Sequence, residues 1–475
     1  MMNEHETINI ADETTIPLRR VLGLPTGILL VAGIMIGSGT FKKIAPMSAA
    51  LMSEPYILTA WIIAGIITMF GAFTLAGLAT TTTQSGGVYE YLRLSVGNFF
   101  SFLYGFTAFT IIGSGSIAAL AFIFSQSLNT LVHIPDPLWG LQDISIGNFI
   151  FPFASSGVKI VAVVAIFLLT WINIRGTKNG GVLNNIVTAA KILGILFMII
   201  AGLFFSNPSV ANTSNAGASI HFSNTGLFSA LFGAMLSAFW AYDGWSIISS
   251  VTGEIKDPKR NVPIAIIAGV GIAMTLYVLL NYTFMQVLPV SELAAIGENN
   301  IAAAVVAGAL MGKAGTVIIS VLIMISTFGA LSACIIVYPR IYYRMAQENF
   351  FFKKAANVHP VFRTPYVSLI FSMIWSSILV VSGTFDLLTN LVIFAGFFFY
   401  GLLSWALIKL KRNGQIQSKV PGYPVVPVIV ILFSLALIVN TVIVQPKQSL
   451  IGLLLVLSGV PFYYYFKRKY GEGVG

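Results

Sequence analysis

Long uninterrupted apolar stretches recur along the whole chain, and they constrain its fold more than any other feature. The stretch VVPVIVILFSLALIVNTVIV (425–444) contains no charged residue. A helix needs about 20 apolar residues to cross the hydrocarbon core of a bilayer. The runs lack the period-two alternation of barrel strands, which favours helical spans. Charged residues make up only 9% of the 475, against about a quarter in a soluble domain. The sequence therefore predicts an all-α integral membrane protein.

About twelve membrane spans are expected from the hydropathy of the chain. Their predicted limits are 22–50, 56–80, 98–131, 158–174, 182–205, 227–249, 264–288, 316–338, 366–381, 385–408, 425–444 and 450–466. The third run is longer than a bilayer requires, so it is expected to tilt or to protrude. No boundary of a soluble domain is visible between the runs.

The distribution of lysine and arginine predicts the orientation. With the N-terminus in the cytoplasm, the outer loops hold only Lys159, Lys313 and Lys447, and the other loop cations lie inside. An even number of spans returns the C-terminus to the cytoplasm, as expected for an inner-membrane protein. The net charge of +10 then indicates contact with anionic membrane lipid, not with nucleic acid. Residues 1–21 lack an apolar core and are expected to form a short polar tail, not a cleaved signal peptide.

Few side chains offer catalytic or metal chemistry. The four histidines, His5, His133, His221 and His359, fall in tails or loops. Cys334 is the single cysteine, so no disulfide forms within the chain, and it is expected to be a small buried core residue. An enzyme needs clustered nucleophiles, acids or metal ligands, whereas the spans offer isolated charges. No enzyme activity, metal or cofactor is predicted.

The first span is weakened at its centre. The stretch GIMIGSGTFKK (33–43) places Gly37, Ser38 and Gly39 inside an apolar run, and each glycine costs a helix about 1 kcal/mol relative to alanine. A second Gly-Ser-Gly, at 113–115 in the third span, is interpreted as a helix-packing face. This pattern alone is thus a weak sign of function.

The sixth span holds the stronger signal. In SAFWAYDGWSIISS (237–250) an acid, Asp243, stands well inside the apolar run and is followed by Gly244. A carboxylate at mid-bilayer depth costs at least ~2.5–3.5 kcal/mol unless something compensates it. Two interpretations stay open: an acid hydrogen-bonded to a neighbouring helix, or an acid at an interrupted helix that faces a polar cavity.

The two interrupted spans lie five apart, which is typical of transporters built from two inverted halves. A broken helix frees N–H groups that attract a carboxylate and C=O groups that attract an ammonium group or a small cation. One broken pair can therefore bind both ends of a zwitterion such as an α-amino acid.

Three lysines lie inside or beside these spans. Lys191 could extend to the cytoplasmic interface, or its ammonium could replace a sodium ion against carbonyl groups of the broken first span, which also leaves proton coupling open. Lys42 and Lys43 are interpreted as reaching the outer interface, and the alternative is a positive outer vestibule.

Several motifs, in register and in order, give the chain a resemblance to a known family. They are GSGTF (37–41), QSGGVYEYL (84–92), FWAYDGW (239–245), GEIKDPKRNVP (253–263), YPRIYYRMAQENFF (338–351) and HPVFRTP (359–365). The chain resembles the amino acid–polyamine–organocation (APC) superfamily of transporters, and within it the bacterial relatives of the L-type amino acid exchangers, which include serine/threonine exchangers. The motifs extend over about three quarters of the chain.

The resemblance implies a five-plus-five inverted-repeat (LeuT-like) core with two added helices. Its expected parts are a cytoplasmic tail (1–21), a first repeat (22–206), a second repeat (226–409), two further helices (424–467) and a second cytoplasmic tail (468–475). Departures from the family pattern are Thr40, Gly77, Thr83 and the double lysine.

The resemblance also implies a binding site for the substrate. The substrate carboxylate would bind the amides of Gly37, Ser38 and Gly39. The amine would bind carbonyl groups of Met35 and Ile36 and of the sixth-span break around Trp240, Asp243 and Gly244. Trp240 would gate the site from outside, and Lys191 would replace sodium.

The predicted function is sodium-independent secondary transport of α-amino acids, mainly small neutral ones, by exchange or proton-coupled symport. Transport of other amines or of cationic amino acids is the alternative, and a channel or receptor is the alternative of another class. No accessory subunit is expected.

Overall fold

The computed structural model describes residues 22–82, 86–146, 150–175, 180–205 and 224–471. Outside these ranges lie the predicted N-terminal tail, Thr83 and Gln84, His5 and His221, and residues 206–223 between the fifth and sixth predicted spans.

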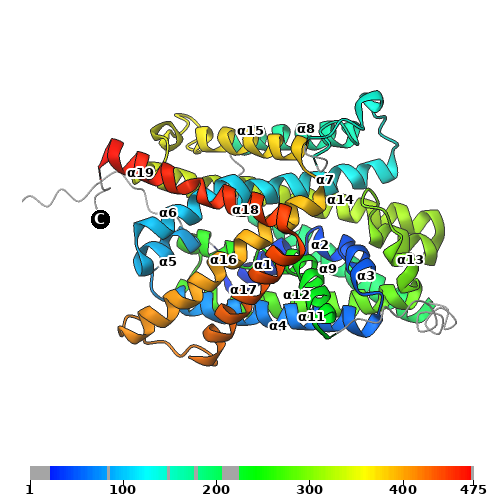
Figure 1. Ribbon diagram of the computed structural model, residues 1–475, viewed down its shortest axis with the longest axis horizontal. Helices are drawn as coiled ribbons and strands as arrows, with labels where there is room; N and C mark the ends of the chain where they lie inside the picture. The colour runs from blue at the N-terminus through cyan, green and yellow to red at the C-terminus, as the bar shows by residue number, and fades with distance from the viewer. Residues whose placement is uncertain (1–21, 83–85, 147–149, 176–179, 206–223, 472–475) are drawn as a thin grey trace, which may run out of the picture.

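The described chain is a bundle of helices that run along one long direction (Figure 1). The first half comprises α1 (Leu24–Met35), α2 (Gly39–Lys42), α3 (Ile44–Leu51), α4 (Glu54–Leu78), α5 (Gly87–Val96), α6 (Asn98–Thr107), η1 (Ala108–Ile112), α7 (Gly113–Leu131), η2 (Trp139–Leu141), α8 (Ser156–Ile174) and α9 (Gly180–Phe205). The second half comprises α11 (Asn224–Tyr242), η3 (Ile247–Glu254), α12 (Pro258–Val287), α13 (Val290–Ala294), α14 (Ala302–Gln347), η4 (Lys353–Ala356), α15 (Tyr366–Ser382), α16 (Phe385–Arg412), α17 (Val425–Val444), α18 (Pro446–Leu457) and α19 (Gly459–Tyr470).

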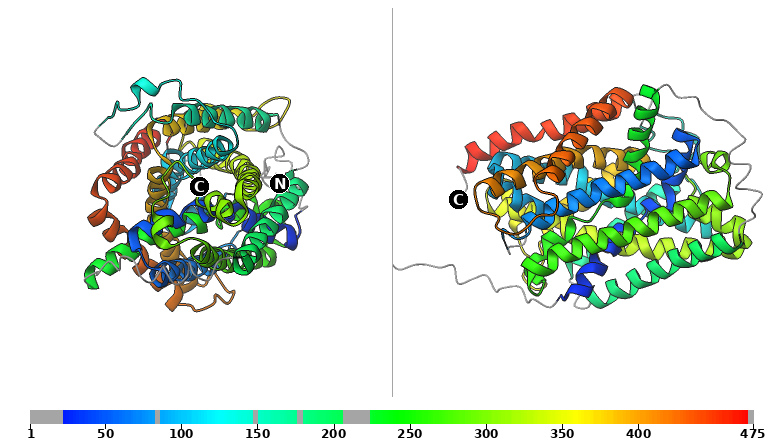
Figure 2. Two further views of the ribbon diagram at one scale, coloured as in Figure 1. Left: turned by 90° about the vertical axis from the view of Figure 1, so that its right-hand side faces the viewer. Right: turned by 90° about the horizontal axis from the view of Figure 1, so that it is seen from below.

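Among the described residues, ten helices are long and apolar enough to cross a membrane, and two shorter apolar helices, 226–242 and 366–382, add to them. This agrees with the predicted twelve runs. Helices α1 and α2 lie inside the bundle, and α11 enters it from the outside and is buried over residues 234–242. Helices α8 and α15 pack together on the outside of the bundle (Figures 1 and 2). The elements α3 and α13 mark one end of the bundle, and α5 marks the other (Figure 1).

The first break falls where the glycines predicted it. Helix α1 ends at Met35, and Ile36 leaves helical geometry with φ −71° and ψ 71°. The amide of Gly37 then donates to the Met35 carbonyl at 2.7 Å, which closes a tight turn before α2 begins at Gly39. A side chain at Gly39 is excluded, because its Cβ would lie 2.4 Å from the Cα atom of Ala241 on α11.

The second break follows directly on α11. Gly244 has φ +100°, a left-handed value that glycine adopts without strain, and a Cβ there would lie 2.7 Å from Ile34. The chain continues as the 3₁₀ helix η3. Gly39 thus packs on α11 and Gly244 packs on α1, so the two breaks face each other across the centre of the bundle.

The third run is irregular. Its residues 108–112 form a π-helical turn, η1, between α6 and α7. Such a turn displaces backbone carbonyls from their usual partners. Tyr342 donates to the Ala108 carbonyl at 3.0 Å, and the Trp375 indole donates to the Thr110 carbonyl at 2.9 Å. The packing role predicted for the glycines 113–115 is confirmed, because Cβ atoms at Gly113 and Gly115 would meet Tyr338 and Val392.

The interpretation of Lys42 and Lys43 as interfacial side chains is wrong, since both are buried, with 2% and 0% of their surfaces exposed. Lys43 forms an ion pair of 2.5 Å with Asp386 of α16. Lys42 donates to the Gln126 side chain at 2.7 Å and to the carbonyl of Glu298. Partners from distant parts of the chain compensate the buried charges, and hydropathy cannot reveal such partners.

Candidate functional site

A cavity of about 370 Å³ lies where the two breaks meet. Its walls come from α1 and α2, from α7, from α11 with the following turn, and from α14. The lining residues are Ile34, Met35, Gly37, Ser38, Gly39, Ser116, Leu120, Trp240, Asp243, Gly244, Ile247, Cys334 and Tyr338. The wall of this cavity therefore contains seven of the nine residues predicted for the site. They are Met35, Gly37, Ser38, Gly39, Trp240, Asp243 and Gly244.

The two other predicted residues lie behind the wall. The Ile36 carbonyl accepts a hydrogen bond from the Ser326 hydroxyl at 3.2 Å, so α14 holds this carbonyl. Lys191 of α9 is 3% exposed, and its Nζ donates to the Gly33 carbonyl of α1 at 2.9 Å. Its ammonium thus points inward and reaches a carbonyl of the broken helix, as one of the two interpretations proposed.

The breaks present backbone dipoles to the cavity. The first bond of α2 joins the Lys43 amide to the Gly39 carbonyl, so the amides of Ser38, Gly39 and Thr40 precede the intrahelical ladder, as the first amides of any helix do. The carbonyls of Met35 and Trp240 each accept one turn-closing hydrogen bond, from Gly37 and Asp243 respectively. Each carbonyl oxygen has a second lone pair for another donor.

Trp240 closes the cavity on the side of α3 and α13. Its indole Nε1 donates to the Ser38 hydroxyl at 3.1 Å, which ties the two breaks together. Its ring packs edge-on against Phe385 at a centroid distance of 6.1 Å. Lys42 and Lys43 lie over the same Phe385 ring, with their Nζ atoms 4.7 and 4.8 Å from its centroid. Trp240, Phe385 and the two lysines form the first barrier, which we call the outer lid.

A second barrier closes the opposite end of the bundle. Leu22 and Ile255 pair as an isolated parallel bridge, with the Leu22 amide 3.0 Å from the Glu254 carbonyl. Nearby, Tyr89 of α5 donates to the Glu348 carboxylate at 2.6 Å, and Arg344 pairs with it at 3.0 Å. Burial and the Glu348 charge raise the pKa of the Tyr89 hydroxyl, so this hydroxyl stays a donor. The central cavity therefore lies between two closed ends.

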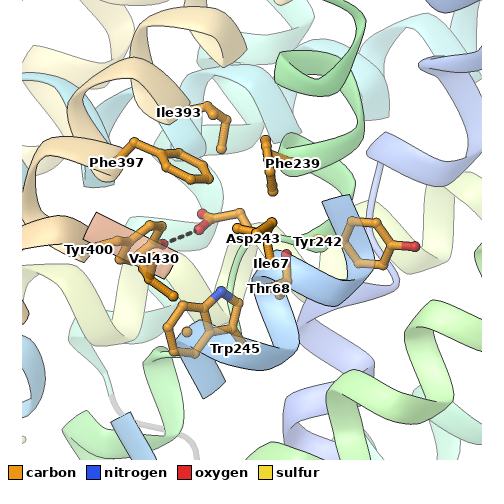
Figure 3. A pocket seen from close by; sticks show the side chains of 11 residues that line it. Ile67, Thr68, Phe239, Tyr242, Asp243, Trp245, Ile393, Phe397, Tyr400 and Val430 are labelled. Atoms are coloured by element: carbon orange, nitrogen blue, oxygen red, sulfur yellow. Dashed lines mark hydrogen bonds between the residues drawn. The ribbon is translucent and has the colours of Figure 1, made fainter. Parts of the chain in front are cut away.

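A second cavity, of about 330 Å³, lies on the far side of the sixth-span break. Figure 3 shows its side chains, with Asp243 pointing between Phe239 and Phe397 toward Tyr400. The Tyr400 hydroxyl donates to Asp243 Oδ1 at 2.6 Å. Both interpretations of Asp243 hold, because it is hydrogen-bonded to a neighbouring helix and also lines cavities at an interrupted helix.

Sequence reasoning missed six lining residues: Ile34, Ser116, Leu120, Ile247, Cys334 and Tyr338. Two signals could have found part of this set. Ser116 directly follows the Gly-Ser-Gly of the third span, and Tyr338 opens the motif YPRIYYRMAQENFF. Cys334 lies one helical turn before Tyr338 and is buried as predicted.

Metal ligands are not clustered in the part of the chain that the structure describes: no three His, Cys, Asp or Glu residues are grouped there so as to hold an ion. The two described histidines, His133 and His359, lie outside helices, as predicted.

Comparison with known proteins gives a consistent result. The family model for "Amino acid permease" matches residues 22–463. The serine/threonine exchanger SteT of Bacillus subtilis (strain 168) is 30% identical over 457 residues, which cover 95% of this chain and 98% of that protein. The b(0,+)-type amino acid transporter 1 of Mus musculus is 30% identical over 458 residues, covering 95% and 89%. The large neutral amino acids transporter small subunit 2 of Mus musculus is 28% identical over 466 residues, covering 96% and 83%.

Proposed function

The chain belongs to the amino acid permease family, and on that premise we propose that its central cavity binds α-amino acids during sodium-independent exchange across the membrane. Its similarity to exchangers and transporters of amino acids over nearly the whole chain supports exchange as the activity. The multi-pass helical fold fits a transporter, not an enzyme.

The meeting of the two breaks is the observation on which the binding mode rests. The amides at the start of α2 would receive the substrate carboxylate, because the N-terminal end of a helix attracts negative charge. The carbonyls of Met35 and Trp240 would receive the ammonium group through their second lone pairs, together with the carbonyl of Asp243. Gly37, Ser38, Gly39 and Gly244 would let the backbone approach the substrate closely.

Lys191 supports sodium independence. Its ammonium lies 2.9 Å from the Gly33 carbonyl and brings a fixed positive charge to a carbonyl of the broken helix. A cation that is part of the chain would make a bound sodium ion unnecessary there. Proton coupling stays compatible with this arrangement.

The size of the cavity supports small neutral substrates. The bulky side chains of Leu120, Trp240 and Tyr338 bound it, and they would exclude a large substrate side chain. The Asp243 carboxylate keeps cationic amino acids as a second candidate class, since it would favour an additional ammonium group.

We also propose that the chain consists of two inverted five-helix repeats with two added helices. It would lie in the inner membrane with both termini in the cytoplasm. In that orientation the outer lid faces the exterior. The protein would work without an accessory subunit.

Proteoliposomes test the proposal. Vesicles preloaded with unlabelled serine should take up labelled serine, threonine or alanine without any sodium gradient. Uptake that requires inward sodium would overturn the role of Lys191. The absence of amino acid uptake under every gradient would overturn the substrate class.

Cys334 provides a direct readout of the site, because it is the single cysteine of the chain and lines the cavity. A transported amino acid should slow alkylation of Cys334 by a small maleimide in detergent. An amino acid that is not transported should leave the alkylation rate unchanged.

A further inference from the structure

The central cavity and the second cavity share one carboxylate, Asp243. Asp243 follows directly after α11 and lines both the cavity at the breaks and the cavity behind them; Figure 3 shows its side chain in the second of these. A third cavity, of about 170 Å³, shares Gly71, Trp245 and Tyr400 with the second one. It continues along α4 and α16 past Thr74 and Ser404, toward their C-terminal ends. Asp243 thus lies at the start of a row of cavities that leads away from the substrate site.

No positive side chain compensates Asp243 within the described ranges. The ion pairs there join Lys43 to Asp386, Arg93 to Glu90, and Arg93 and Arg344 to Glu348. Lys191 of α9 donates to the Gly33 carbonyl instead.

The titratable groups that face Asp243 are all neutral at physiological pH. They are Tyr104 from α6, Cys334 and Tyr338 from α14, and Tyr400 from α16. Tyr400 supplies one hydrogen bond, at 2.6 Å. The Gly244 amide supplies a second hydrogen bond, but neutral donors do not balance a full negative charge at membrane depth, where an unpaired carboxylate is strongly disfavoured.

The compensating positive charge must therefore come from outside the chain. Building on the proposed function, we propose that Asp243 is the proton-exchanging group of the transport cycle. In the loaded protein its carboxylate faces the substrate ammonium, and in the empty protein it holds a proton. Substrate binding releases that proton from Asp243 to the side from which the substrate entered, and substrate release lets a proton from the opposite side return to the same oxygen atoms. One proton thus moves opposite to each amino acid that is transported without a counter-substrate.

The proposal separates two transport modes. Exchange keeps the carboxylate next to an ammonium group throughout, so its rate should vary little with pH. Net transport requires the empty protein to change its orientation, and this step is favourable only when Asp243 is protonated. Net transport should therefore slow about tenfold for each pH unit once most empty carriers have lost the proton.

Proteoliposomes loaded with labelled serine and a pH-sensitive dye test this. Efflux is measured with and without external serine between about pH 5 and about pH 8, a range reached by shifted carboxylates. We expect net efflux to fall as pH rises, with a dye signal that reports protons moving inward as serine leaves, while exchange stays nearly constant. If exchange occurs but net efflux does not change with pH, the role of Asp243 in proton exchange is overturned, and the proposed transport function is not. A lack of both modes for serine, threonine and alanine would overturn the proposed function itself.

Two variants and a matched control assign the effect to Asp243. Asp243→Asn should remove the pH dependence of net efflux and the dye signal. Tyr400→Phe retains the carboxylate but loses the hydrogen bond that favours its charged form, so the midpoint should move to higher pH. Glu54→Gln, a carboxylate-to-amide change at the start of α4 whose side chain contacts Gln286, should behave as wild type. A pH dependence that survives in Asp243→Asn, or an unmoved midpoint in Tyr400→Phe, would contradict the assignment.

Discussion

A methyl group at Gly39 would lie 2.4 Å from the backbone of Ala241, and this contact makes the residue a direct test of the paired breaks. We expect Gly39→Ala to push α2 away from α11 and to weaken substrate binding about fivefold or more, since overpacking costs about 1–3 kcal/mol. Protection of Cys334 from alkylation by serine measures the loss.

The matched control for this prediction is Gly233→Ala. A Cβ atom at Gly233, on the same helix α11, would meet no other atom within 4 Å. Serine should protect Cys334 in this variant as in the wild type. Full protection in Gly39→Ala would mean that the close approach of α2 and α11 is not needed for binding.

Lys191 carries the second prediction at this scale. Lys191→Ala leaves the buried Gly33 carbonyl without its charged donor. A hydrogen bond to a charged group contributes about 1.5–3 kcal/mol to the stability of the conformation that contains it. We expect labelled serine uptake at saturating substrate to fall about tenfold or more, because the first break loses the cation that holds its carbonyl. Lys313→Ala, at an exposed position on α14, controls for the loss of a positive charge. Wild-type uptake by Lys191→Ala in sodium-free buffer would remove this lysine from the transport mechanism.

At the scale of elements, the outer lid holds α2 against α16. The Lys43 side chain is fully buried and Asp386 is 29% exposed, so loss of the carboxylate charge leaves the buried ammonium without an anionic partner and with the Thr389 hydroxyl as a neutral one. Breaking such a pair costs about 3 kcal/mol. Asp386→Asn should therefore shift the protein toward a conformation that is open at this end.

Cys334 reports that shift. A membrane-impermeant maleimide added outside should label Cys334 faster in Asp386→Asn than in wild type, up to about a hundredfold if the whole penalty favours opening. Thr384→Ala removes only the hydroxyl that caps the start of α16 and should label at nearly the wild-type rate. Equal labelling in Asp386→Asn and wild type would show that the ion pair does not hold this end closed.

Most elements could be predicted from local sequence. The run 425–444 was placed with the bounds of α17, and the limits 385–408 fall inside α16, because apolar length alone defines a membrane helix. The breaks were found because Gly37, Gly39 and Gly244 contradict their apolar surroundings. The helical part of α14 before Gly312, which has φ +62°, was missed.

The side chains whose locations were predicted wrongly or missed are placed by contacts with residues far away in the sequence. Lys42 and Lys43 were assigned to the interface because Asp386 and Glu298 are separated from them by more than 250 positions. Tyr338 and Ser116 reach the cavity only through the packing of α7 against α14. No local pattern contains such information, so the backbone part of the candidate site was predictable and much of its side-chain wall was not.

The whole molecule is closed at both ends, and alternating access requires that the two ends open in turn. The outer lid closes one end, and the contacts of Glu348 with Tyr89 and Arg344 close the other. Because both barriers act on the same cavity, weakening one should expose the cavity to one side only. Glu348→Gln should therefore open the end opposite to the one opened by Asp386→Asn.

Sided labelling of Cys334 tests this last prediction. Right-side-out vesicles should label faster with Asp386→Asn, and inside-out vesicles should label faster with Glu348→Gln, each relative to wild type. Glu292→Gln, at an exposed position on α13 that makes none of the contacts named for the two barriers, should change neither rate. The part of α14 after Gly312 links the cavity to the second barrier, because it carries Cys334 and Tyr338 and leads to Glu348. Faster labelling from the same side in both variants would mean that the two ends do not act as alternate barriers to one site.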